Sequence, residues 1–154
     1  MEQYIQPFIS VTSAIFKSML AIDVAPDRAY FADKEAFLDW DISGIIALTG
    51  GVKGLVALSM KYPAATKITG ILTQKEKISK TEMTDAVGEL VNIISGNVKK
   101  NLEDLFQITI SIPKVVNGIA HMVVIPDDRI RLLCIPFTIF DNEIICLSIN
   151  IQEY

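Results

Sequence analysis

The sequence predicts an α+β fold, with a mixed or antiparallel β-sheet and at least one long helix. Apolar residues recur at steps of three and four in residues 3–21 and 81–105, which is typical of amphipathic helices. Residues 39–60 and 129–152 instead place apolar residues at every second position, as β-hairpins do. The length of 154 residues predicts one domain, residues 1–154, and because 51% of the residues are hydrophobic we expect it to have a buried core.

The first helix is expected over residues 3–21. Proline is tolerated only near the first turn of a helix, so the regular part is expected to begin close to Pro7. Residues 23–27, which include Pro26, break the helix. A short extended piece is expected at residues 28–31.

The hairpin at residues 39–60 is constrained by the parity of its apolar positions. Residues that face each other in a hairpin have a constant sum of positions, so even must pair with even. The connection around Gly50-Gly51 therefore needs an odd number of residues or a bulge, rather than a two-residue turn. No Gly-Lys-Ser/Thr follows, which favours a turn over a phosphate-binding loop. The even positions are Ile42, Gly44, Ile46 and Leu48, then Val52, Gly54, Val56, Leu58 and Met60.

A second helix and a linker precede the 81–105 segment. Tyr62-Pro63 begins this helix, because proline suits the first helical position, and the helix is expected to end around residues 70–73. Residues 74–80 form a charged connector, in which Ser79 is suited to cap the next helix, as is Thr81.

Short strands follow the long helix. Residues 106–116 predict a strand that Pro113 interrupts, and Asn117-Gly118 predicts a turn. Residues 119–125 predict another short strand. That strand carries His121, for which we expect a structural role.

The last hairpin, residues 129–152, has odd parity on both strands. The same pairing rule predicts a three-residue loop, Asp141-Asn142-Glu143. The other face of the first strand is apolar too, and Pro136 disfavours a fully paired central position. We therefore expect a second subunit to cover this region. The odd positions are Leu133, Ile135, Phe137 and Ile139, then Ile145, Leu147, Ile149 and Ile151.

Composition excludes several classes of function. The net charge of −4 and the lack of basic clusters argue against a nucleic-acid partner. No apolar run is long enough to span a bilayer, and the amino terminus lacks a basic region followed by an apolar run, so we expect a cytoplasmic protein without a membrane partner. Cys134 and Cys146 are expected to be reduced core thiols. The single histidine lacks partners for a zinc site or a catalytic triad, so we expect no metal.

The helix at residues 81–105 carries the candidate chemistry. At about 100° per residue, its polar residues gather opposite the apolar face. Glu89 and Asn92 are three residues apart, so their side chains are neighbours, and Gly96 one turn later leaves the backbone bare. This arrangement suits close contact with another molecule, although many polar helix faces are merely solvated. The polar residues are Asp85, Glu89, Asn92, Gly96, Lys99 and Glu103.

A family motif makes this helix more specific. The pattern Asp85-x-x-x-Glu89-x-x-Asn92 fits the Asp/Ser-x3-Glu-x2-Asn motif of the CheC/CheX/FliY family of response-regulator phosphatases. The surrounding Asp-Ala-Val-Gly-Glu-Leu-Val-Asn and Gly-Asn-Val-Lys resemble the CheX branch. CheC-type members carry two Glu-x-x-Asn copies, whereas this chain has one, as CheX does. The resemblance implies a CheX-like domain with helices packed on one face of the sheet.

The resemblance also implies a function. It implies a phosphatase that dephosphorylates a CheY-like response regulator, in chemotaxis or another two-component pathway. Asn92 would orient the attacking water and Glu89 would pair with the regulator's lysine, while Asp85, Gly96 and Lys99 are expected to contact the partner. The Mg²⁺ would belong to the regulator, so no cofactor of its own is expected, and a homodimer is implied. The alternative is a non-catalytic module that docks a phosphorylated receiver in signalling or in the flagellar switch.

Overall fold

One antiparallel β-sheet organises the fold in the computed structural model, which describes residues 2–121, 131–140 and 142–154. In chain order the elements are α1 (Glu2–Leu20), β1 (Ala25–Pro26), β2 (Tyr30–Ala32), the 3₁₀ helix η1 (Lys34–Asp39), β3 (Ile42–Gly50), β4 (Val52–Met60), α2 (Tyr62–Thr73), α3 (Lys80–Leu102), β5 (Ile108–Ile110), β6 (Lys114–Asn117), β7 (Leu132–Ile139) and β8 (Glu143–Glu153). The strand order is β1-β7-β8-β4-β3-β5, with β2 also paired to β7 and β6 to β3.

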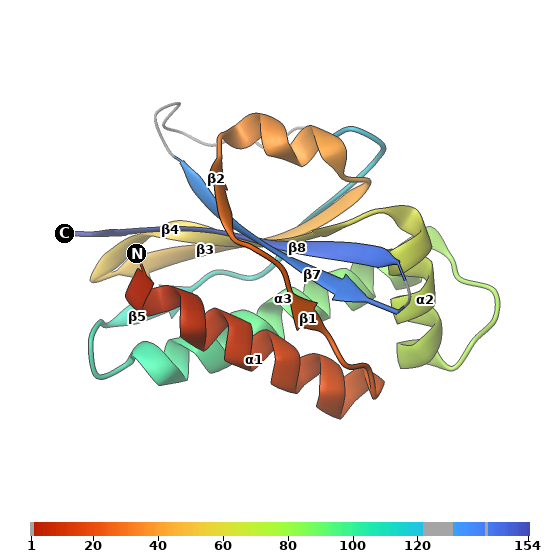
Figure 1. The fold of residues 1–154 in the computed structure, drawn as a ribbon, viewed down its shortest axis with the longest axis horizontal. Coiled ribbons are helices and arrows are strands. Elements are labelled where there is room, and N and C mark those ends of the chain that lie inside the picture. Colours follow the sequence, from red (N-terminus) through yellow and green to blue (C-terminus); the bar gives the residue numbers. More distant parts are fainter. Residues whose placement is uncertain (1, 122–130, 141) are drawn as a thin grey trace.

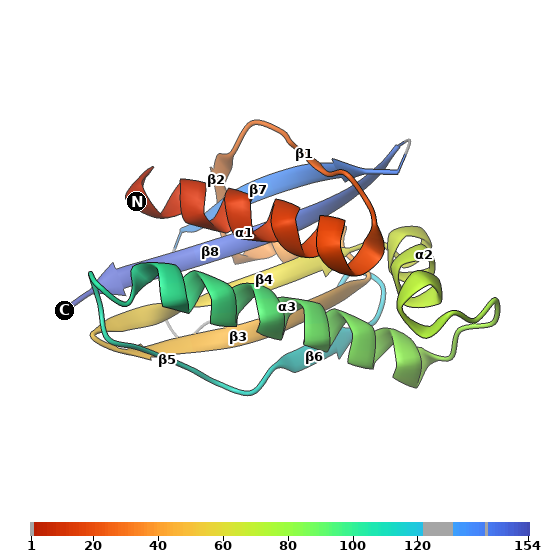
Figure 2. The same cartoon turned by 90° about the horizontal axis from the view of Figure 1, so that it is seen from below.

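The long helices cover one face of this sheet. Figures 1 and 2 show α1 and α3 side by side across that face, α2 at one end of the sheet, and η1 on the opposite side. The apolar even positions of β3 and β4 and the odd positions of β7 and β8 point toward the helices and are mostly buried. Phe8, Phe16 and Phe137 are among the largest fully buried side chains there. The α+β fold with helices on one face is thus confirmed.

The first hairpin has the parity that the sequence predicts. Ile42 pairs with Met60 and Leu48 with Gly54, so even positions face even positions. Only Gly51 separates the two strands, and its amide donates to the Gln107 carbonyl at 2.7 Å. Gly50 has a φ of 102°, a left-handed conformation that costs glycine little. The odd-length connection is confirmed.

The second hairpin also pairs odd with odd positions, but its loop lies one residue earlier than predicted. Ile139 pairs with Glu143, so Glu143 belongs to β8 and residues 140–142 connect the strands. Asp141 lies outside the described residues. Parity alone does not distinguish the predicted register from the observed one. Both registers pair odd residues with odd residues, so both keep the same side chains on the buried face.

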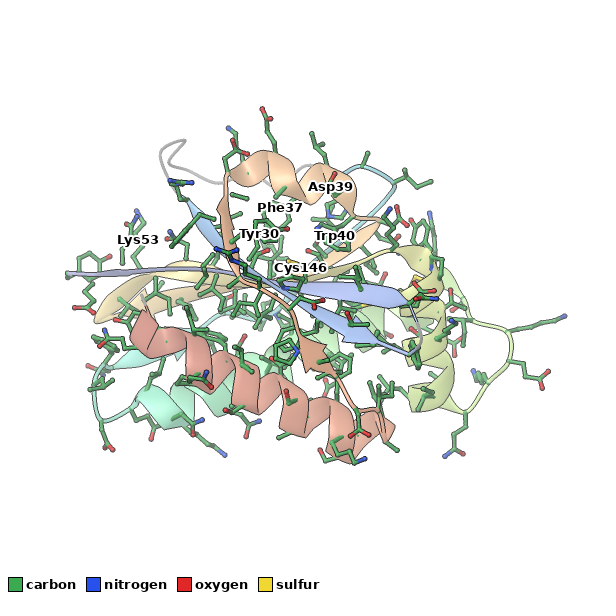
Figure 3. All side chains as sticks on the ribbon, viewed as in Figure 1. Tyr30, Phe37, Asp39, Trp40, Lys53 and Cys146 are labelled. Carbon is green, nitrogen blue, oxygen red and sulfur yellow. The ribbon has the colours of Figure 1, made fainter. Side chains whose placement is uncertain are left out.

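The chain itself covers the second apolar face of β7, where we expected another subunit. Leu132 and Cys134 are 0% and 1% exposed, and they cluster with Phe37 of η1, Ala57 and Cys146. Figure 3 shows Phe37 and Trp40 between η1 and the sheet. A local cap starts η1, since Asp33 Oδ1 accepts the Glu35 amide at 2.9 Å. Burial of this face therefore gives no evidence for a dimer.

Three further elements depart from expectation. The helix α1 begins at Glu2, so Pro7 lies inside it rather than at its start. The extended piece expected at residues 28–31 corresponds to β2, and another short strand, β1, lies within the break expected at residues 23–27; both strands pair with β7. Residues 119–121 form no strand, and residues 122–125 lie outside the described part of the chain. Among the described helices, none has both the length and the apolar character that crossing a bilayer requires.

Candidate functional site

The helix α3 begins with a complete capping box. Ser79 Oγ accepts the Glu82 amide at 3.1 Å, and Glu82 Oε1 accepts the Ser79 amide at 3.2 Å. Lys75 lies 3.0 Å from the other Glu82 oxygen, and the hydrogen bonds from Lys75 and Ser79 hold the pKa of Glu82 below its usual value. Of the two caps that the sequence allowed, Ser79 is the one used. The cap sets where the helix starts and which residues follow on each face.

Removing the Ser79 hydroxyl is expected to lower the free energy of unfolding by about 1 kcal/mol, because an amide at the helix start loses its partner. Urea denaturation of Ser79→Ala measures the change. Thr81→Ala is the matched control, since Thr81 is exposed in the same turn and its side chain makes no hydrogen bond within the described residues. Equal unfolding free energies for the two variants would contradict the capping role.

Close packing at two glycines brings α3 close to the sheet. A Cβ at Gly44 would lie 3.0 Å from a methyl of Val91, and one at Gly88 would lie 3.2 Å from a methyl of Val115. Larger side chains at these positions would push the helix away from β3 or β6. The residues of α3 that face the sheet and the other helices are buried, namely Met83, Ala86, Val87, Leu90, Val91, Ile94, Val98 and Leu102.

The motif side chains therefore point outward, as the periodicity predicts. Asp85 and Glu89 are exposed, and Asn92 is half-buried one turn beyond Glu89. Within residues 2–121, 131–140 and 142–154, the side chains of Glu89 and Asn92 make no hydrogen bond or ion pair. A carboxylate and a carboxamide are thus side by side with their donors and acceptors available to another molecule.

Two shallow depressions flank the motif. One lies toward the β6 edge and is lined by Thr84, Asp85, Gly88, Glu89, Pro113 and Val115. The other lies toward α2 and is lined by Leu72, Thr73, Glu82, Asp85, Ala86 and Glu89. Asp85 and Glu89 border both, so they stand on a ridge rather than in a pocket. A ridge suits entry into another protein's site, whereas small ligands usually need a concave pocket.

The other two predicted contact residues lie farther along the same helix. A Cβ at Gly96 would meet no atom within 4 Å outside its own helix, so the backbone there is open to approach. Lys99 is half-buried and borders a depression with Glu103, Gln107 and Thr109. Because α3 rises about 1.5 Å per residue, Lys99 stands about 10 Å beyond Asn92. Contact with a partner at Gly96 or Lys99 stays a prediction.

The remaining reactive side chains serve the core. His121 is buried, with Nε2 2.7 Å from Ser43 Oγ and Nδ1 2.9 Å from the Gly118 carbonyl. Both ring nitrogens thus contact groups of the fold itself, so His121 has a structural role. Cys134 and Cys146 are free and buried, and the Cys134 sulfur together with burial raises the pKa of Cys146. Among the described residues, no group of three or more His, Cys, Asp or Glu side chains is placed to hold a metal ion.

Sequence reasoning missed the polar contacts that anchor the start of α3. Thr84 receives a hydrogen bond from Asn117, which in turn accepts one from Tyr62. The Asn-Gly pair at residues 117–118 indicated only a turn. These partners lie 33 and 55 positions from Asn117 along the chain, so no local pattern pointed to them.

Comparison with known proteins identifies a family and several structural relatives. The family model described as Chemotaxis phosphatase CheX matches residues 42–138, more than half of the chain. A CheC-like superfamily protein from Shewanella sp. PV-4 is 25% identical with a TM-score of 0.83, and 97% of each chain is covered. A chain in the CheX–CheY–BeF₃–Mg²⁺ complex from Borrelia burgdorferi is 25% identical with a TM-score of 0.79, covering 97% of this chain and 98% of that one. The chemotaxis protein CheX from Vibrio vulnificus is 22% identical with a TM-score of 0.84, covering 97% and 99%. No curated protein matches the sequence.

Proposed function

The chain belongs to the CheX family of chemotaxis phosphatases, and we propose that it removes the phosphoryl group from a CheY-like response regulator. The observation that carries this proposal is the Glu89–Asn92 pair on the outward side of α3, where Glu89 is exposed, Asn92 is half-buried, and neither side chain has a partner among the described residues. The relative from Borrelia burgdorferi forms a complex with CheY, which supports a receiver domain as the partner.

The proposed reaction needs little from the catalyst beyond positioning. Water attacks phosphorus in line, the bond between phosphorus and the aspartyl oxygen breaks, and the aspartate leaves as a carboxylate. This carboxylate is a good leaving group, so no strong base or covalent intermediate is required. The carboxamide of Asn92 both accepts and donates hydrogen bonds, so it is suited to hold the water in line. We expect the regulator to hold the Mg²⁺ that neutralises the phosphoryl oxygens.

The neighbouring side chains would dock the helix. Glu89 is exposed and has no cation among the described residues, so it is available to pair with the lysine of the regulator's active site. Asp85 stands one turn before it and would support docking. The open backbone at Gly96 permits close approach, and Lys99 would contact the regulator beyond the reacting group.

Decay of a phosphorylated receiver domain tests the proposal. We expect the regulator's phosphoryl group to be lost faster when this protein is added, with inorganic phosphate released. A receiver that binds but decays at its own rate would contradict the proposed activity. That outcome would favour the second candidate, a non-catalytic module that docks a phosphorylated receiver in signalling or in the flagellar switch. The presence of both Glu89 and Asn92 favours the enzyme.

A homodimer and a cytoplasmic location are part of the same proposal. The expected mass in solution is twice the 17.0 kDa of one chain. Static light scattering across a range of concentrations measures it. A mass that stays near 17.0 kDa at every concentration would contradict the dimer.

A further inference from the structure

A chain of hydrogen bonds anchors the first turns of α3. Asn117, at the end of β6, donates from Nδ2 to Thr84 Oγ1 at 3.2 Å. The Tyr62 hydroxyl donates to Asn117 Oδ1 at 2.7 Å. One carboxamide therefore joins the beginning of α2, the edge of the sheet and the beginning of α3.

The same chain continues into the sheet. The Tyr62 amide donates to Asp41 Oδ2 at 2.8 Å, and the Gly118 amide donates to the Asp41 carbonyl at 2.8 Å. Asp41 directly precedes β3, which α3 covers. The groups involved are half-buried, so their hydrogen bonds are partly shielded from water.

We propose that Thr84 and Asn117 are positioning residues, which set the rotation of α3 and thereby aim Glu89 and Asn92 at the regulator. This inference rests on the proposed phosphatase function. The hydrophobic effect that holds α3 on the sheet is non-directional, whereas a hydrogen bond weakens steeply when its angle changes and so adds an angular constraint to the close packing at Gly44 and Gly88. The Thr84–Asn117 bond lies one residue before Asp85 and about two turns before Asn92, so a rotation there moves the whole motif.

The expected effect is on turnover rather than on binding. A shift of about 1 Å in a catalytic group can cost up to about a hundredfold in rate, and a small rotation of α3 should cost less. Thr84→Val keeps the shape of the side chain and removes the hydroxyl. We expect kcat to fall about three- to tenfold, with KM changed by less than about twofold. Thr84→Ser should restore kcat, because it restores the acceptor.

Thr81→Val is the matched control. It makes the same chemical change in the same helix, at an exposed residue whose side chain makes no hydrogen bond among the described residues. Equal kcat values for Thr84→Val and Thr81→Val would overturn the proposal, as would a failure of Thr84→Ser to restore turnover.

Amide hydrogen exchange separates this inference from the phosphatase function. If the hydrogen bond holds the helix, residues 84–92 should exchange faster in Thr84→Val than in Thr81→Val, whether or not a receiver is present. Tyr62→Phe should speed the same amides, and its effect should not add to that of Thr84→Val, because both act through Asn117. Unchanged exchange would overturn the anchoring role even if the protein proves to be a phosphatase. Conversely, if the wild-type protein does not dephosphorylate the receiver but Thr84→Val still exchanges its amides faster, the phosphatase function is contradicted and the anchoring role of the hydrogen bond is supported.

Discussion

Asn92→Ala is expected to slow the catalysed dephosphorylation of the receiver about a hundredfold or more, which is the cost of losing one oriented polar group in other enzymes. The carboxamide is half-buried, has no partner among the described residues, and would hold water only as the reaction proceeds. Binding of the receiver should therefore survive, because the lost interaction belongs to the transition state. Single-turnover decay of the phosphorylated receiver measures the rate, and titration of the receiver measures the affinity.

Asn97→Ala is the matched control for this variant. Asn97 lies on the same helix and is half-buried, but its Nδ2 is already committed to the Ile93 carbonyl at 2.8 Å. We expect Asn97→Ala to keep nearly normal turnover. Normal turnover by Asn92→Ala would contradict the water-positioning role, and equal losses in both variants would indicate damage to the helix instead.

Glu89→Lys is expected to weaken docking of the receiver by at least about thirtyfold in Kd, or about 2 kcal/mol. The substitution removes the proposed ion pair and sets two positive charges against each other. Glu89 is exposed in the free protein, so the loss should appear in the affinity and leave folding nearly unchanged. Titration calorimetry with the phosphorylation-competent receiver measures it.

The control for charge alone is Glu76→Lys. Glu76 is exposed in the connector between α2 and α3, and its substitution changes the net charge by the same amount. If Glu76→Lys weakens binding as much as Glu89→Lys, the effect comes from the overall field and the specific pair is contradicted. A specific contact should also persist at higher salt, where long-range effects are screened.

The fold could be predicted where side chains alternate strictly. In β3 and β4 the apolar even residues, from Ile42 to Leu48 and from Val52 to Met60, face the helices, so a one-residue slip would turn this apolar set away from them. The same argument determines which face of α3 is polar, and it placed Glu89 and Asn92 outward correctly. The spacing of the apolar residues therefore predicts both the register of the first hairpin and the outward orientation of the motif.

Other features of the fold and the site could not be predicted, because they depend on contacts between residues that are far apart in the sequence. The short helix η1 has no repeat long enough to reveal it, and Phe37 is buried only because β4, β7 and β8 present a second apolar surface to it. Without η1, that surface was interpreted as a subunit interface. The anchor at Thr84 was missed for the same reason, since an Asn-Gly pair indicates a turn and says nothing of what its side chain will contact.

The most direct test of this account is a crystal structure of the protein bound to its receiver loaded with beryllofluoride. We predict that α3 enters the receiver's active site, with the Asn92 carboxamide within about 3 Å of a water in line with the beryllium–aspartyl bond. Glu89 should contact the receiver's lysine in the same complex. A complex that buries another surface and leaves Glu89 and Asn92 in solvent would contradict the account.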